Sequence, residues 1–178
     1  FAYCSSLTGI VIPDSVTAIG AAAFYKCTDL TSVVIPNSVI MIGGHAFAKC
    51  PSLTDIVIPD SITEIARAAF ADCPALTGIV ISENTTKIGC KAFSGCSSLT
   101  RVTIPGTVTE IGEYAFSGCT GLTAMVIPNG VAEIGDGVFS WCKNLTNITV
   151  DDANTAYCSE NNILYTKNKK KVIAAAGA

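Results

Sequence analysis

Apolar side chains recur along this chain with a period of 23 residues, and several positions of the repeat hold a single residue type. These fixed positions are Phe1, Phe24, Phe47, Phe70, Phe93, Phe116 and Phe139; Leu7, Leu30, Leu53, Leu76, Leu99, Leu122 and Leu145; and Ile19, Ile42, Ile65, Ile88, Ile111 and Ile134. A constant step without insertions is typical of a repeat solenoid, in which each unit forms one coil and stacks on the next. The columns therefore predict one continuous core.

The unit at 99–121 shows how each coil divides into elements. Apolar and polar residues alternate over 99–104, which predicts a strand, and the proline and glycine of 105–107 predict the turn that ends it. Alternation returns over 108–111 as a second short strand, and the apolar spacing of 115–119 predicts a helical or 3₁₀ turn. We expect about seven coils, stacked through parallel β-sheet faces into a rod of about 30–35 Å.

Composition then limits the classes of partner. The 178 residues include 14% charged side chains and carry a formal net charge of −3, without the clustered basic face that a nucleic acid partner requires. The uncharged stretch at 30–48 is long enough for a membrane span, but Pro36, Asn37 and Ser38 interrupt it and its pattern recurs elsewhere with charges. We expect no nucleic acid partner and no transmembrane segment. Because the chain begins at Phe1 in mid-repeat, we expect a piece of a longer protein.

Nine cysteines raise the question of metals and disulfides. Seven follow the 23-residue step: Cys4, Cys27, Cys50, Cys73, Cys96, Cys119 and Cys142. Parallel side chains in a column cannot surround a zinc ion, and their Cβ atoms point alongside one another rather than together. We expect a buried thiol column, with no metal and no other cofactor. Cys90 and Cys158 lie off the column; Cys90 shares its position with polar and charged residues and is the best candidate for a reactive thiol.

No group of residues indicates catalysis. The single histidine, His45, occupies a solvent-tolerant position, and Cys50, which is near it in sequence, belongs to the buried column. A nucleophilic Cys–His pair would need an exposed cysteine and a third residue that orients the histidine. Paired acids, metal-ligand spacings and phosphate-binding loops are also missing from the sequence, so we expect no catalytic residues and no enzyme.

Written from its common positions, the unit reads Leu-Thr-x-Val/Ile-x-Ile-Pro-x-Ser-Val-Thr-x-Ile-Gly-x-x-Ala-Phe-x-x-Cys. In this form it resembles the BspA-like, or Treponema pallidum-type, leucine-rich repeat over residues 1–150. The resemblance implies a right-handed leucine-rich-repeat coil, with a C-terminal cap at 151–178 that contains a β-hairpin. It also implies a bacterial or protozoan protein, extracellular or on the cell surface, that acts as an adhesin toward host matrix proteins or other cells.

Two departures from the pattern concern single turns. Unit four reads Ile-Ser-Glu-Asn-Thr at 81–85, where the other units have Ile-Pro and an apolar Val or Ile. Ala66 replaces a glycine that the other units keep, so this position need not have a positive φ in every coil. Both changes affect a loop shape and leave the predicted fold unchanged.

Because inward positions are taken up by packing, a ligand of a solenoid must be recognised by outward ones. One outward column of the first strand is β-branched throughout: Val11, Val34, Val57, Val80, Thr103, Val126 and Thr149. The column beside it varies, and Asp55 and Arg101 are its only charges. The candidate binding face comprises Asp55, Val57, Val80, Arg101, Thr103, Val126 and Asn147. Two explanations of the β-branched column remain open: a protein-binding surface, or the ordinary residue preference of an exposed sheet.

Three further features also allow two interpretations each. A column of threonines either resembles an ice-binding array or satisfies backbone groups where each strand begins, which we favour. Its members are Thr8, Thr31, Thr54, Thr77, Thr100, Thr123 and Thr146. Trp141 is an exposed aromatic contact or, as we favour, a cover for the last coil. Lys167, Lys169, Lys170 and Lys171 either attract a polyanion or membrane surface, or protect a hairpin from edge-to-edge pairing.

The sequence thus supports two hypotheses of function. The first is a non-enzymatic module that binds a protein or glycan through outward columns of the sheet. The alternative is a passive structural stalk that carries another domain.

Overall fold

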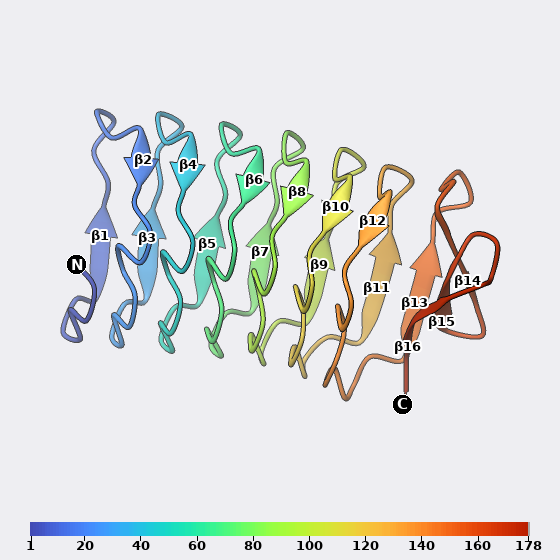
Figure 1. The fold of residues 1–178 in the computed structure, drawn as a ribbon. Helices are drawn as coiled ribbons and strands as arrows, with labels where there is room; N and C mark the ends of the chain where they lie inside the picture. Colours follow the sequence, from blue (N-terminus) through green and yellow to red (C-terminus); the bar gives the residue numbers. More distant parts are fainter. Residues whose placement is uncertain (178) are drawn as a thin grey trace.

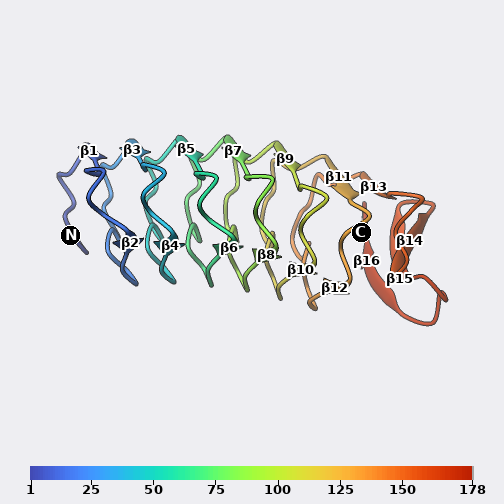
Figure 2. The same cartoon turned by 90° about the horizontal axis from the view of Figure 1, so that it is seen from above.

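The computed structural model describes residues 1–177, and these form a solenoid whose coils follow one another along a single axis (Figure 1, Figure 2). One series of strands comprises β1 (Gly9–Val11), β3 (Ser32–Val34), β5 (Asp55–Val57), β7 (Gly78–Val80), β9 (Arg101–Thr103), β11 (Ala124–Ile127) and β13 (Asn147–Val150). The other comprises β2 (Ala18–Ile19), β4 (Met41–Ile42), β6 (Glu64–Ile65), β8 (Lys87–Ile88), β10 (Glu110–Ile111) and β12 (Glu133–Ile134). The solenoid therefore holds six complete coils and the beginning of a seventh.

Neighbouring coils pair in parallel, with each residue opposite the one 23 positions further on. Gly9 lies opposite Ser32 in the first series, and Ile111 lies opposite Ile134 in the second. Strands β1, β3, β5, β7 and β9 form one sheet, and β11 pairs with β13 in a separate one. Within β5, Ile56 is buried while Asp55 and Val57 face out, as alternation along a strand requires. The predicted stacking through parallel sheets is confirmed.

A stack of phenylalanines runs through the core. From Phe1 to Phe139, successive ring centroids lie 5.1 to 6.0 Å apart, and the ring planes deviate from parallel by no more than 22°. Phe47, Phe70, Phe93 and Phe116 have no exposed surface. Each ring therefore completes the burial of its neighbours, and the predicted shared core is confirmed.

The cysteine column lies beside the phenylalanines. Each thiol from Cys27 to Cys142 donates to the carbonyl of the phenylalanine one coil earlier, as Cys96 Sγ does to Phe70 O at 3.1 Å. Burial raises the pKa of Cys50 and Cys142 to about 11 and that of Cys96 still further. These thiols are therefore neutral near pH 7, and all nine cysteines are free. At the first coil, Cys4 is exposed.

The segment after each second-series strand is a succession of turns, and the predicted helical or 3₁₀ turn is wrong: residues 1–177 contain no helix. Two positions per coil have a left-handed backbone, which interrupts any right-handed helix. One column is Ala22, His45, Ala68, Lys91, Tyr114 and Gly137, and the other is Tyr3, Lys26, Lys49, Asp72, Gly95, Gly118 and Trp141. Their N–H groups point along the stack, so that Gly118 donates to Ser140 O at 2.7 Å in the next coil.

The irregular fourth unit keeps its turn through side-chain hydrogen bonds. Ser82 Oγ donates to Asp60 Oδ1 at 2.9 Å and accepts the Asn84 N–H at 3.1 Å, so a hydroxyl replaces the constraint of a proline. Thr85 is buried at the usual valine position, and its hydroxyl donates to Ile62 O at 3.2 Å. The change is local, as expected.

The glycine column that contains Ala66 does not have a positive φ, in agreement with the sequence analysis. Its glycines are needed for close approach between coils. A Cβ added to Gly112 would lie 2.5 Å from the backbone nitrogen of Cys90.

The chain ends in an antiparallel sheet of β14 (Tyr157–Glu160), β15 (Ile163–Thr166) and β16 (Val172–Ala175). The predicted capping hairpin is β15–β16, and β14 adds a third strand. Buried Asn154 and Tyr157 provide hydrogen-bond partners for backbone groups in and near β12, the last second-series strand. The Tyr157 hydroxyl accepts the Ile134 N–H at 2.8 Å, and the Asn154 amide donates to Val131 O at 3.0 Å. The proposed limit of the cap, residue 178, lies outside the described residues.

Candidate functional site

The β-branched column forms an exposed apolar stripe on the first-series sheet. Its valines, Val11, Val34, Val57, Val80 and Val126, are 58–73% exposed. Within residues 1–177 these side chains remain largely uncovered. The stripe is therefore free to contact a ligand, although exposure alone leaves both explanations of it open.

A depression of about 320 Å³ lies across β5, β7 and β9. It exists because the middle strand presents a glycine: Gly78 pairs with Asp55 on one side and Arg101 on the other. A Cβ at Gly78 would meet nothing within 4 Å, so the gap is open space. Val57, Val80 and Thr103 form the adjoining row of the lining.

The opposite charges of Asp55 and Arg101 lie on either side of this depression and do not form an ion pair with each other. Asp55 and Arg101 are two strands apart, roughly 9.6 Å at the usual spacing. Among residues 1–177, no ion pair joins either of them to an opposite charge. A rigid sheet thus holds a carboxylate and a guanidinium apart over an apolar floor, an arrangement that suits a ligand with complementary charges.

The structure brings most of the predicted face together. Asp55, Val57, Val80, Arg101 and Thr103 line the depression. Val126 and Asn147 are exposed on the same series of strands but lie in the separate β11–β13 sheet, outside the depression. Gly78 was not selected from the sequence, although it is a smaller residue between two charged positions of one column.

The features with two interpretations are also placed. Thr31, Thr54 and Thr146 donate their hydroxyls to the threonine carbonyl one coil earlier, at 2.9–3.4 Å, which confirms the backbone role at these positions. Trp141 is 75% exposed, so the favoured interpretation as a cover for the last coil is wrong.

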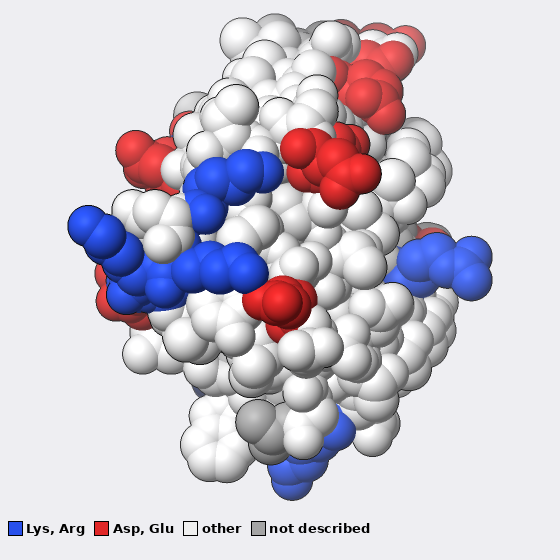
Figure 3. Space-filling view, turned by 90° about the vertical axis from the view of Figure 1, so that its right-hand side faces the viewer, with Lys and Arg blue, Asp and Glu red and all other residues white. Residues whose placement is uncertain are grey.

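The lysine run occupies the turn between β15 and β16, at the end of the molecule that Figure 3 faces. Lys169 pairs with Glu160 at 2.6 Å and Lys171 with Asp136 at 3.0 Å, while Lys167 Nζ donates to Asn154 O. Figure 3 shows the largest group of basic side chains on the left of this end, others at its right and lower edges, and acidic side chains between them on a mostly uncharged surface. Most of the run therefore makes contacts within the chain.

The side chains that could act as nucleophiles, as acids or bases, or as metal ligands are scattered over the molecule. His45 is exposed and Cys50 is buried, so they form no nucleophilic pair. Cys90 and Cys158 are partly buried. Within residues 1–177, no three His, Cys, Asp or Glu side chains come together as a metal site, and no helix is long and apolar enough to cross a bilayer.

Comparisons with known proteins agree with this architecture. A family model described as the BspA type leucine rich repeat region matches residues 1–122 and 63–175, in six copies. The solved structure of a leucine rich cell surface protein from Faecalibacterium prausnitzii A2-165 is 41% identical over 98% of this chain, with a TM-score of 0.87. This chain covers 48% of that protein, less than half its length.

Two further solved structures show the same arrangement. The leucine rich repeat protein of T. pallidum is 39% identical, and the match covers 79% of this chain and 68% of that one, with a TM-score of 0.76. A leucine-rich repeat protein from Bacteroides ovatus is 31% identical over 86% of this chain and 45% of its own, with a TM-score of 0.67. No curated protein matches the chain.

Proposed function

Because the chain belongs to the BspA-type leucine-rich repeat family, we propose that it is a non-enzymatic binding module displayed on the cell surface or outside the cell. A solved relative is described as a cell surface protein, which supports this location. The proposed ligand is a protein or glycan of the host matrix or of another cell. The ligand contacts the first-series sheet.

The observation that carries this proposal is the depression between Asp55 and Arg101. Exposed valines alone are also expected from β propensity. That preference does not account for two opposite charges that have no ion-pair partner among residues 1–177 and that flank a depression where Gly78 lacks a side chain. A sheet whose backbone is fixed by pairing on both sides presents these groups with little entropy to lose on binding.

The direct test is binding of the whole chain to immobilised host matrix proteins and mucin glycans, measured by biolayer interferometry. The variant Asp55→Asn/Arg101→Gln leaves the net charge unchanged and removes both charges of the depression. We expect saturable binding by the native chain and about tenfold weaker binding by this variant, since each charge loses its complement.

The matched control is Lys49→Gln/Glu64→Gln, which also preserves net charge and changes exposed residues away from this sheet face. We expect it to bind like the native chain. Equal binding by both double variants would remove the depression from the ligand site. If the native chain binds no member of the panel, the competing function, a rigid stalk built on the continuous core, is favoured instead.

A further inference from the structure

The charges of the first-series sheet are arranged symmetrically about its middle strand. Of the seven first-series strands, β7 is the fourth, and it lies between β5 and β9. Asp55 and Arg101 stand at the same register on these two neighbours, and each is paired with Gly78. The three outward columns of this face, namely the threonine, the variable and the β-branched column, contain no other charged residue. A half-turn about an axis along β7 therefore exchanges the positions of the negative and the positive charge.

A face with this symmetry is complementary to a second copy of itself. In a two-fold interface, every contact of one residue with another is repeated with the two copies exchanged. When the axis runs parallel to β7 and midway between two facing sheets, Asp55 of each copy lies opposite Arg101 of the other. The strands of both sheets then run in the same direction, which suits the aligned packing of sheets at about 30°. Facing sheets lie about 10 Å apart, a gap that an aspartate and an extended arginine side chain bridge together.

The uncharged rows of the face match under the same operation. Val80 lies opposite Val80 of the second copy, and Val57 lies opposite Thr103. One strand further out, the constant 23-residue step places Val34 opposite Val126. All five side chains are exposed in the single chain, so the contact removes apolar surface from water on both copies.

The depression lies on this axis and leaves room for the charged side chains. At the middle strand, Gly78 faces Gly78 of the second copy, so the two depressions of about 320 Å³ meet. A Cβ added at Gly78 would meet nothing within 4 Å, and the space is therefore open to the two arginines. Among residues 1–177, neither Asp55 nor Arg101 has an ion-pair partner, so association breaks no existing salt bridge.

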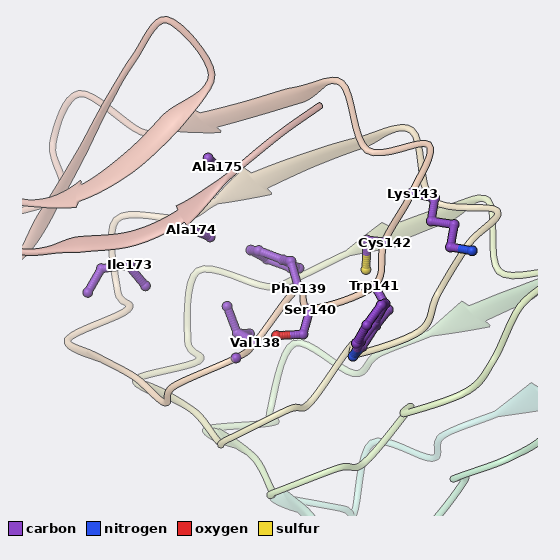
Figure 4. A pocket seen from close by; sticks show the side chains of 10 residues that line it. Val138, Phe139, Ser140, Trp141, Cys142, Lys143, Ile173, Ala174 and Ala175 are labelled. Carbon is purple, nitrogen blue, oxygen red and sulfur yellow. The ribbon is translucent and has the colours of Figure 1, made fainter. Parts of the chain in front are cut away.

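The shape of the molecule permits this contact. In Figure 2, strands β1, β3, β5, β7 and β9 form a nearly straight row along one edge of the solenoid, so two such faces can meet along their length. The hollow beside the cap, which is lined by Phe139, Ser140 and Ile173, includes no residue of the first-series strands (Figure 4). That hollow therefore stays outside the contact.

The contact is small, which makes the expected pair weak and reversible. Seven strands about 4.8 Å apart, each presenting about 10 Å of its length, give a face of roughly 30 by 10 Å per copy. This is less than a standard stable interface, so we expect a pair that exchanges rather than a permanent dimer. Copies displayed side by side on a surface raise the effective concentration, and many weak pairs then hold together.

We propose that the first-series face binds the same face of a second copy of this chain, through two reciprocal Asp55–Arg101 ion pairs flanking the axis. The inference rests on the proposed function, in which this face is the binding surface, and it names the partner as the chain itself. On a cell surface, such pairs join copies on one cell or on two neighbouring cells.

Charge reversal tests the reciprocal pairing, because the pairing predicts a rescue. Self-association of the whole chain is measured by sedimentation velocity between about 10 μM and about 1 mM, a range suited to a weak pair. Asp55→Arg or Arg101→Asp alone places like charges opposite each other at both contacts, so each variant should associate at least about tenfold more weakly. An equimolar mixture of the two variants regains both opposite-charge contacts and should associate within about threefold of the native chain. The double variant Asp55→Arg/Arg101→Asp should also associate with itself.

The matched controls are Glu64→Arg and Lys49→Asp, which make the same changes in net charge at exposed positions away from this face. Each should associate like the native chain, and circular dichroism of every variant checks that the fold is retained. A chain that stays monomeric at about 1 mM would overturn the proposal. Equal association of all variants, or a mixture that stays dissociated, would overturn it as well.

The panel of matrix proteins and glycans is measured on the same samples, which separates this inference from the proposed function. Panel binding without self-association would overturn the inference and leave the proposed function standing. Self-association that follows the charge variants, without panel binding, would support the inference and remove the host ligand. Absence of both would reject both and favour the stalk.

Discussion

The middle of the solenoid and its last coil contain the same residue types in the same positions, yet these residues have different surroundings. Phe93 has no exposed surface and stacks on rings at 5.6 and 5.5 Å, and its N–H donates to Ala115 O at 2.8 Å. Phe139 is 7% exposed, has one ring neighbour at 6.0 Å, and its N–H has no acceptor in residues 1–177. A repeat position therefore acquires its role from the coil that follows it.

The largest expected effect is on the free energy of unfolding, and it differs between these two phenylalanines. Phe93→Ala should lower the free energy of unfolding by about 3–5 kcal/mol, because it opens a cavity between two coils. Phe139→Ala should cost roughly half as much, because its ring stacks on a neighbouring phenylalanine on one side only. Urea unfolding of both variants, followed by circular dichroism, checks the difference. Equal losses would contradict the distinction between middle and end.

The next effect concerns the cysteine column at alkaline pH. The unfolded thiols ionise near their ordinary pKa of 9.0, whereas burial raises the pKa in the folded chain, to about 11 for Cys142 and further for Cys96. Above pH 9 the folded state therefore binds more protons than the unfolded state. The stability contributed by the neutral thiols is complete below about pH 9 and is lost as the pH rises through 11.

Each fully protected thiol makes the loss steeper by about 1.4 kcal/mol per pH unit. Replacing one middle thiol, as in Cys96→Ala, should reduce this slope by about that amount, and Cys142→Ala should reduce it only until the pH approaches 11. Urea unfolding between pH 8 and 10.5 under reducing conditions measures the slopes. A slope unchanged by Cys96→Ala would show that this thiol ionises equally in both states.

The smallest expected effect compares two residues of one left-handed column. Gly118→Ala should destabilise the chain by about 1 kcal/mol, because a Cβ is strained at φ 74° although the space around it is sufficient. Trp141→Gly removes the same kind of strain and should leave stability unchanged or raise it by up to about 1 kcal/mol. Thermal unfolding of the two variants gives the signs. A loss for Trp141→Gly would mean that the exposed indole stabilises the cap.

A column of the repeat was predictable from the sequence when it holds a single residue type. The Phe and Cys columns hold one residue type, so their inward position and stacking were predictable. The left-handed columns hold Ala, His, Lys, Asp, Tyr, Gly and Trp, and this variety concealed the backbone conformation behind an apparent helical spacing. Gly95, Gly118 and Gly137 were the only local signal, and they lie in the later coils.

The candidate site and the cap differ in the same way. Asp55 and Arg101 were recognisable as the only charges of an outward column, and the constant step placed them on either side of Gly78. How the cap covers the last coil was not predictable, because it depends on where β14, β15 and β16 lie relative to that coil. A periodic sequence determines contacts between coils and contains no information about the carbonyls that a missing coil would have supplied.

Residue-resolved amide hydrogen exchange of the unliganded chain tests most directly the claim that the last coil differs from the middle only through its missing neighbour. The N–H groups of Phe93 and Gly118, bonded at 2.8 and 2.7 Å, should be protected close to the free energy of global unfolding. Those of Phe139 and Trp141 should exchange at least about a hundredfold faster. Equal protection at Phe93 and Phe139 would contradict the account.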